Sequence, residues 1–315
     1  MKKAVGIDVS KSDLDVYCNW NDAQIKVKNT KAGIRKLCKQ LLVESPELAV
    51  LEPTGVYHRE VFRRLHEAGI PVCVANPKRA RDFAKALGVL AKTDKIDAAL
   101  LAKFGSGGTL RVSEPVSPDQ EKLQDLVVRR KQLLKNVVAE KNRRSSASRS
   151  LRASHSRMIT CLIKEIRCIE TLISNLIKDC PEFEAKRKIL TSAKGVGPVL
   201  AMVILGSLSE IGTLGHKQIS ALVGVAPFAN DSGRHRGKRS IYGGRTIVRN
   251  TLYMATLSAT KHNPQIRQFY QRLIDNGKPV KVAQTACMRK LLLTLNAMIR
   301  DGRDWTTPQI KVSAT

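Results

Sequence analysis

Four carboxylates in the first hundred residues have the chemistry to hold a divalent metal ion. Asp8 and Glu52 each end an apolar run typical of a β-strand, and Asp94 and Asp97 lie in the first turn of a predicted helix. Acids also occur at helix starts because they stabilise the macrodipole, by about 0.3–1 kcal/mol each. Four carboxylates at one point, however, repel one another and need a cation to stay ionised. Oxygen ligands favour Mg²⁺, with Mn²⁺ as the alternative ion.

Each acid also has an ordinary interpretation. The sequence Gly-Ile-Asp at Asp8 also opens the phosphate site of actin-like ATPases, and Glu52 precedes Pro53, so it could be only a turn residue. The nearby Asp13 and Asp15 are expected on the solvent face of their strand. The set of four acids in this order is more specific than any single member.

The elements around these acids follow the order of a ribonuclease-H-like mixed sheet. We expect three strands, then helices and strands in alternation, over residues 3–8, 12–20, 23–28, 31–43 (helix), 48–52, 57–68 (helix), 72–75, 79–87 (helix) and 92–104 (the helix of Asp94 and Asp97). Asp8 and Glu52 then end neighbouring central strands and converge at one edge of the sheet. The expected fold class is α/β followed by a mostly helical part.

The composition favours a nucleic acid as the partner. The chain has 315 residues and a formal net charge of +28, and a polyanion both relieves this self-repulsion and releases counterions on binding. A membrane surface is the weaker alternative, because the basic residues are spread along the whole chain. No apolar run approaches the ~20 residues of a membrane span, and the first strand begins too early for a signal peptide. We therefore expect a cytoplasmic protein.

The seven cysteines form an odd set without a Cys-x-x-Cys pair. This pattern predicts neither a disulfide framework nor a structural zinc site. The thiols are expected to be reduced and mostly buried.

The middle of the chain is predicted to form long helices. From residue 117 to about 179, apolar residues recur at steps of three and four, the spacing of a coiled-coil seam that packs within the chain or between two copies. The stretch 141–152 between the two apolar stripes is basic and contains no acid. We predict that Arg143, Arg144 and Arg149 contact phosphates, although a solvated helix end has the same composition.

The last third combines a glycine turn with a basic loop. Residues 188–205 have the spacing of a helix-hairpin-helix, in which Lys194, Gly195 and Gly197 would let backbone amides approach a phosphate. The same pattern also serves plain helix packing. Residues 227–245 are expected to be a flexible loop, and helices are expected at 218–225, 249–261 and 280–299. Cations of this loop that could neutralise phosphate charge are Arg234, Arg236, Lys238, Arg239 and Arg245.

Together these motifs resemble one family along nearly the whole chain. They are GIDVS at Asp8, EPTGVY at Glu52, KTDKIDA at 92–98, GVGP at 195–198, DSG at 231–233 and LYMA at 252–255. The chain resembles the DEDD transposases of the insertion sequence 110 family, which include the Piv-like site-specific DNA invertases.

The resemblance implies a domain order and a set of functional residues. It implies a RuvC-like catalytic domain at 1–113, coiled-coil helices at 114–181, and a transposase domain at 182–315. Asp8, Glu52, Asp94 and Asp97 correspond to the metal-binding DEDD set, and Ser232 corresponds to a serine nucleophile. In this family the enzyme recombines donor and target DNA, guided by a noncoding bridge RNA, as a homo-oligomer (dimer or tetramer) at the bacterial nucleoid.

The implied chemistry is transposition through a covalent phosphoserine link to the DNA end. A serine hydroxyl needs activation by a metal or base, and cations must stabilise the transition state. Two alternatives remain: a RuvC-like, Mg²⁺-dependent junction nuclease that uses water, and a non-catalytic nucleic-acid-binding scaffold. Asp-Ser-Gly is also an ordinary turn, Ser240 is a rival nucleophile, and His235 is either a general base or a phosphate contact.

Overall fold

The computed structural model describes residues 2–89, 94–107, 110–229, 231–232, 235–237 and 239–305. The chain divides into two compact units, Met1–Val116 and Ser117–Thr315. Each unit is described by itself.

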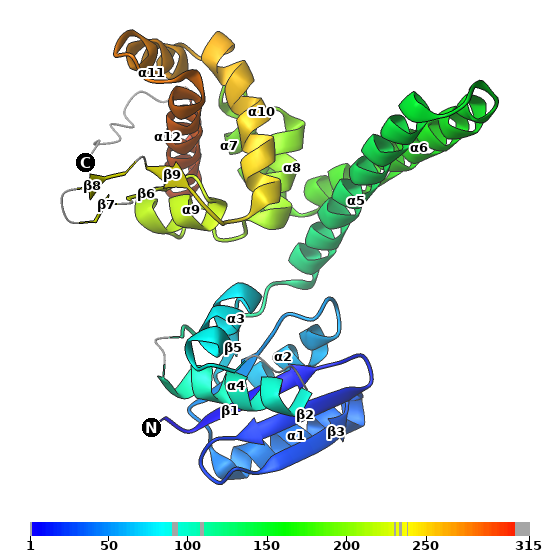
Figure 1. The fold of residues 1–315 in the computed structure, drawn as a ribbon, viewed down its shortest axis with the longest axis vertical. Coiled ribbons are helices and arrows are strands. Elements are labelled where there is room, and N and C mark those ends of the chain that lie inside the picture. The colour runs from blue at the N-terminus through cyan, green and yellow to red at the C-terminus, as the bar shows by residue number, and fades with distance from the viewer. Residues whose placement is uncertain are drawn as a thin grey trace. The chain divides into compact units, whose positions relative to one another are not determined.

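The amino-terminal unit contains a five-stranded mixed sheet in the order β3-β2-β1-β4-β5 (Figure 1). Its strands are β1 (Ala4–Val9), β2 (Asp13–Cys18), β3 (Gln24–Lys28), β4 (Leu48–Leu51) and β5 (Val72–Val74). β1 pairs antiparallel with β2 and β2 with β3, whereas β1, β4 and β5 run parallel. The mixed α/β sheet predicted from the sequence is confirmed.

Helices cover both faces of this sheet. On one face, α1 (Lys31–Glu44) and α2 (His58–Glu67) bury Leu37 and Leu65 against alternate residues of β1, such as Val5 and Ile7. On the other face, α3 (Pro77–Ala86) and α4 (Asp94–Gly107) bury Leu101 with residues of β4. Side chains alternate along a strand, so each face collects every second residue.

The second unit begins with an antiparallel helical hairpin of α5 (Pro118–Ser146) and α6 (Arg149–Asp179) (Figure 1). Arg130 lies 2.7 Å from Glu170, and Glu140 lies 2.8 Å from His155. The two helices therefore run antiparallel and remain in contact over most of their length. The apolar stripes are buried in part: Ile173 is 1% exposed, whereas other members of the stripes remain on the surface.

The rest of this unit is a helical assembly that continues the core of the hairpin base. Its elements are α7 (Pro181–Ser192), α8 (Pro198–Ser207), α9 (His216–Val223), β6 (Pro227–Phe228), β7 (Asp231–Ser232), β8 (His235–Arg236), β9 (Ser240–Ile241), α10 (Thr246–His262), α11 (Pro264–Asp275) and α12 (Val280–Asp301). One apolar cluster extends from Leu123 on α5 to Met298 on α12. Within the described ranges, no helix combines the length and hydrophobicity needed to cross a bilayer.

One sequence expectation is wrong in this unit, and one helix had not been predicted. The segment 227–245 was expected to be a flexible loop, but it contains two short antiparallel pairs, β6–β9 and β7–β8. Helix α11 was not expected, although Asn263 caps it by accepting a hydrogen bond from the Ile266 amide at 3.3 Å.

Candidate active site

Asp8 lies on the face of β1 that packs against helix α4. An added Cβ at Gly6 would lie 1.9 Å from the Ala98 carbonyl oxygen and 2.5 Å from the Ala102 amide nitrogen, so the helix backbone lies directly on the strand. Side chains two residues apart on a strand share a face. Asp8 therefore projects from the same face as Gly6, and it is partly buried.

Glu52 lies beside Asp8 at the end of the neighbouring parallel strand. The register pairs Gly6 with Val50 and Ile7 with Leu51, so the next residues along the two strands are Asp8 and Glu52. Neighbouring strands are about 4.8 Å apart. The sequence-predicted convergence of these two acids is thus supported by the strand register.

Asp97 reaches the same region from α4. A small pocket on this side of the sheet is lined by both Glu52 and Asp97, together with Arg81 of α3 and Leu101 of α4. Leu100 and Phe104 of α4 are buried, and the helix backbone at Ala98 and Ala102 lies against Gly6 of β1. The structure thus brings Asp8, Glu52 and Asp97 to one end of one sheet face.

The fourth acid is described only in its backbone. Asp94 is the first residue of α4, one helical turn before Asp97, and its side chain is outside the described part, as are residues Lys92 and Thr93. Among the described side chains, no group of three or more His, Cys, Asp or Glu residues is close enough to form a metal site.

A fifth acid, Asp15, lies next to Asp8. The expectation that it would face solvent is wrong: β2 places Asp15 directly opposite Asp8, its side chain is 13% exposed, and Lys26 lies 3.5 Å away. Directly opposed residues have Cβ atoms about 4.5–5.5 Å apart. The tight turn between β1 and β2 could have indicated this pairing in the sequence.

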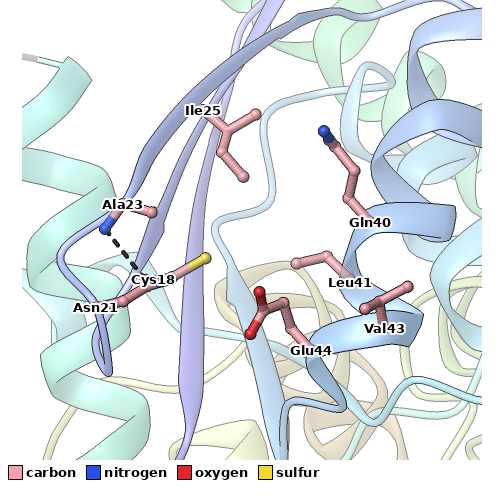
Figure 2. Close-up of a pocket in the computed structure, with 8 residues that line it drawn as sticks. All are labelled: Cys18, Asn21, Ala23, Ile25, Gln40, Leu41, Val43 and Glu44. Carbon is pink, nitrogen blue, oxygen red and sulfur yellow. Dashed lines mark hydrogen bonds between the residues drawn. The ribbon is translucent and has the colours of Figure 1, made fainter.

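The other face of the sheet holds a separate pocket between β2, β3 and α1 (Figure 2). Cys18, Ile25 and Leu41 line it with the Glu44 carboxylate at its rim. Burial raises the pKa of the Cys18 thiol to about 11, so the thiol stays protonated at neutral pH. All seven cysteines, each within the described residues, are free.

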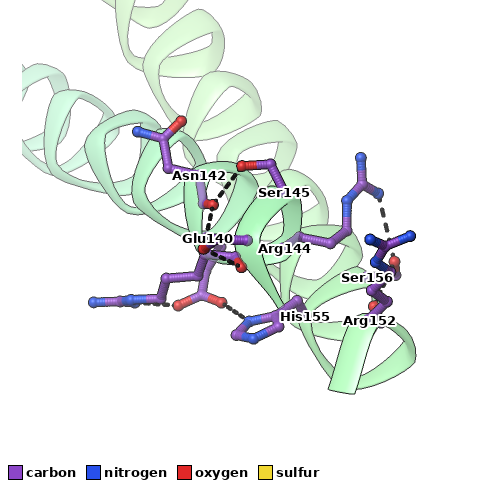
Figure 3. A network of polar contacts seen from close by, with 9 residues as sticks. Glu140, Asn142, Arg144, Ser145, Arg152, His155 and Ser156 are labelled. Atoms are coloured by element: carbon purple, nitrogen blue, oxygen red, sulfur yellow. Dashed lines mark hydrogen bonds and ion pairs between the residues drawn. The ribbon is translucent and has the colours of Figure 1, made fainter. Parts of the chain in front are cut away.

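The tip of the helical hairpin concentrates the predicted phosphate contacts. Arg143 pairs with Glu140, which also contacts His155, and Arg144 donates to the Ser156 hydroxyl at 3.4 Å (Figure 3). Hydrogen bonds from His155 and Arg143 hold the pKa of Glu140 below its usual value. The ionised Glu140 carboxylate therefore already pairs with Arg143, one of the predicted phosphate contacts. Arg149, at the start of α6, is exposed.

The two glycines of the helix-hairpin-helix have different surroundings. Gly195 has a φ of +98°, and an added Cβ would lie 2.6 Å from the Ala259 Cα of α10. Asn263 further fixes this turn by donating to the Lys194 carbonyl at 3.2 Å. At Gly197, by contrast, an added Cβ would meet nothing within 4 Å. Gly195 is required by packing, and Gly197 leaves the start of α8 open.

The predicted nucleophile lies on a short hairpin. Ser232 of β7 pairs with His235 of β8, and β6 and β9 pair at the base of the same segment. The side chains of Ser232, His235 and Arg236 are outside the described part, as are residues Arg234 and Lys238.

Two arginines at the end of this segment behave differently. Arg239 is exposed. The Arg245 guanidinium donates to both carboxylate oxygens of Glu210, at 2.5 and 2.6 Å, and to the Ser207 carbonyl at 3.0 Å. Burial opposes ionisation of Glu210, but the hydrogen bonds from Arg245 hold its pKa below the usual value. Arg245 thus anchors the segment to the turn after α8.

Comparison with known proteins identifies sequences that are similar over nearly the whole chain. Residues 5–148 match a transposase model for DEDD proteins of the insertion sequence 110 type, and residues 187–271 match the model "Transposase IS116/IS110/IS902 family". The chain is 27% identical to the pilin gene-inverting protein of Moraxella lacunata and 26% identical to that of Moraxella bovis. Each alignment covers 96% of this chain and 97% of the relative.

One solved structure gives a weak match. T. thermophilus RuvC in complex with a Holliday junction substrate aligns at 16% identity with 36% of this chain and 100% of its own. The TM-score of this match is 0.28.

Proposed function

The chain belongs to the insertion sequence 110 family of transposases and recombinases, and we propose that it cuts donor and target DNA and rejoins the strands through a phosphoserine intermediate. The observation that carries the proposal is the placement of Asp8, Glu52 and Asp97 at one end of one sheet face. A net charge of +28 suits a DNA partner. The relatives named as pilin gene-inverting proteins support recombination as the reaction type.

Asp8, Glu52, Asp94 and Asp97 would hold Mg²⁺ or Mn²⁺ in the first unit. Carboxylate oxygens are the ligands that these ions prefer, and the strand register brings two of them side by side. When bound, the ion would polarise a phosphoryl oxygen and stabilise the charge of the transition state. Lys26 neutralises Asp15 beside this set, so the fifth acid adds less negative charge.

Ser232 would act as the nucleophile. Its oxygen would bond to the scissile phosphorus while the bond from phosphorus to the leaving sugar oxygen breaks. The hydroxyl proton goes to a base, for which His235 is a candidate, and the leaving oxygen gains a proton. The phosphodiester bond energy is kept in the serine ester, so a strand hydroxyl can reseal the DNA without ATP.

The three parts of the chain would have separate roles. We assign residues 1–113 as a RuvC-like catalytic domain, 114–181 as a coiled-coil arm, and 182–315 as the transposase domain that grips DNA. Exposed apolar side chains on α5 and α6, including Val138 and Leu172, support contact with a second copy of the chain. The basic tip of the arm, with Arg143, Arg144 and Arg149, would contact DNA or a guide RNA.

Denaturing gels test the proposal on the full chain with its copurified RNA and a labelled DNA substrate. We expect a protein–DNA adduct with the wild type, no adduct with Ser232→Ala, and neither adduct nor cleavage with Asp97→Asn. Cleavage that survives Ser232→Ala without an adduct would establish the water-dependent nuclease instead. Unchanged recombination in Asp8→Asn, Glu52→Gln and Asp97→Asn would remove any catalytic role for the acids.

A further inference from the structure

Two exposed aromatic side chains lie at the base of the Ser232 hairpin. Phe228 is 48% exposed on β6, and Tyr242, the residue after β9, is 65% exposed. By comparison, Phe104 and Phe183 are buried in the cores of their units, at 7% and 4% exposure. Large exposed rings are costly to hydrate, so two of them at one place indicate a surface with a partner.

Continuing the register of the β6–β9 pair by one residue puts Phe228 and Tyr242 on one face. Phe228 is directly opposite Ser240, and Tyr242 lies two residues beyond Ser240, where an extended chain presents its side chains on the same side. Diagonal neighbours of this kind are roughly 7–8 Å apart. This is about twice the ~3.4 Å spacing of stacked nucleotides, which leaves room for one base between the rings.

The turn after Tyr242 is held rigidly. Gly243 and Gly244 have φ values of +67° and +73°, and an added Cβ at Gly244 would lie 2.3 Å from the Gly224 amide nitrogen at the end of α9. Arg249 donates to the Gly243 carbonyl, and Arg245 is bound to Glu210. A fixed platform loses little conformational entropy when it binds a ligand, which favours affinity.

The charges around the two rings favour a nucleic acid as the ligand. The segment 227–245 has Asp231 as its sole acid and includes the exposed Arg239. Aromatic rings beside cations form the usual platform for unpaired bases, because every base has a π-face and every nucleotide a phosphate. A duplex keeps its bases stacked inside and cannot use such a platform in the same way.

We propose that Phe228 and Tyr242 sandwich one unpaired nucleotide next to the scissile phosphate. Ser232 is four residues from Phe228, a distance of at most about 14 Å along an extended chain. This placement rests on the proposed role of Ser232, but the binding itself does not. An unpaired base held here would keep the cut strand in place until it is rejoined.

Binding of fluorescent oligonucleotides to the full chain tests the platform. Stacking on one aromatic ring corresponds to about 5- to 150-fold in affinity, so we expect Tyr242→Ala and Phe228→Ala each to weaken single-stranded DNA binding about tenfold. Duplex binding should change little, and Tyr242→Phe should keep the wild-type affinity. Val280→Ala, which removes an equally exposed apolar side chain, is the matched control and should have no effect.

Salt dependence separates stacking from charge. Tyr242→Ala should leave the slope of log affinity against log salt unchanged, whereas Arg239→Gln should reduce its magnitude by about 0.7. An oligonucleotide with one abasic position at the platform should bind the wild type weakly and be insensitive to Tyr242→Ala.

Three results would overturn the platform. They are wild-type affinity of Tyr242→Ala for single strands, equal losses on duplex and single-stranded DNA, and an altered oligomeric state, which would indicate a protein partner instead. All measurements are repeated in the Ser232→Ala background, where adducts are absent. Adduct formation is measured separately with Ser232 intact. Aromatic-dependent binding without any adduct would contradict only the proposed reaction, and adduct formation without aromatic-dependent binding would contradict only this inference.

Discussion

The two glycines of the helix-hairpin-helix should respond to alanine in opposite ways. At Gly195 the backbone has a φ of +98°, which costs an L-residue about 1–2 kcal/mol. The added methyl would also lie 2.6 to 2.8 Å from atoms of Ala259, and such overpacking costs typically 1–3 kcal/mol. We therefore expect Gly195→Ala to lower the free energy of unfolding of the second unit by about 2–5 kcal/mol.

Gly197→Ala should leave the stability almost unchanged. Gly197 is the N-cap of α8, with a φ of −91° that any residue adopts, and its added Cβ meets nothing within 4 Å. Loss of a preferred cap residue costs about 0.5–1 kcal/mol. Alanine also lowers the conformational entropy of the unfolded chain, which stabilises the folded state by about 0.4–1 kcal/mol. The two effects nearly cancel.

The functional effects should be reversed. By position, the Val199 and Leu200 amides at the start of α8 have no partner inside the helix, and the methyl of Gly197→Ala would occupy the open space beside Gly197 that a phosphate would otherwise enter. Hydrogen bonds to a charged group contribute about 1.5–3 kcal/mol, so we expect DNA affinity to fall about tenfold. Because no cation is lost, the salt slope should stay near the wild-type value.

Thermal unfolding and DNA binding of the full chain measure both effects. The stability change at Gly195 corresponds to a decrease of roughly 4–20 °C in the melting temperature, while Gly197→Ala should melt within a few degrees of the wild type. Lys194→Gln is the charge control and should reduce the salt slope by about 0.9. Wild-type DNA affinity in Gly197→Ala would refute phosphate binding by the start of α8, and the turn would then serve only helix packing.

Three further predictions follow from the described contacts. Gly6→Ala should destabilise the amino-terminal unit by at least about 1–3 kcal/mol in thermal unfolding, because its methyl would overlap the α4 backbone; wild-type stability would refute the close contact. The folded-state pKa of Glu210 is lowered, so its contribution is present above the ordinary pKa of ~4.3 and is lost as the pH falls through the folded pKa. The stability difference between wild type and Glu210→Gln should be constant from pH 7 to about 5 and shrink in more acidic urea titrations; a change already at pH 6 would contradict this assignment. Cys18, with a pKa of about 11, should resist iodoacetamide at pH 8 while the exposed Cys161 reacts, as read by peptide mass spectrometry.

Much of the amino-terminal unit could be predicted because its local patterns and its tertiary contacts agree. Leu14, Val16 and Cys18 alternate with polar residues in the sequence, and all three are buried on one face of β2. Residues with such a clear period have one way to bury their apolar side. The order of these elements then predicted the mixed sheet.

The segment 227–245 was mispredicted because its structure depends on distant partners. Glycine and arginine are typical of loops, whereas the observed order comes from the pairing of Pro227 with Ile241 and from the bond between Arg245 and Glu210. Neither contact leaves a periodic trace in the sequence. Helix α11 differs, because Asn263 followed by Pro264 is a typical helix start that is visible in the sequence.

The acids of the candidate site illustrate the same distinction. The convergence of Asp8 and Glu52 could be predicted because each acid follows an apolar run, and the corresponding ends of neighbouring parallel strands lie at one edge of a sheet. The position of Asp15 required the register across the β1–β2 turn, because a shift of one residue would turn its side chain to the opposite face. Lys26 from β3 pairs with the Asp15 carboxylate, which lies directly opposite Asp8, and this pairing reduces the repulsion between the two acids. A candidate metal site read from motif acids alone therefore leaves out a charge pair that the sheet itself places beside it.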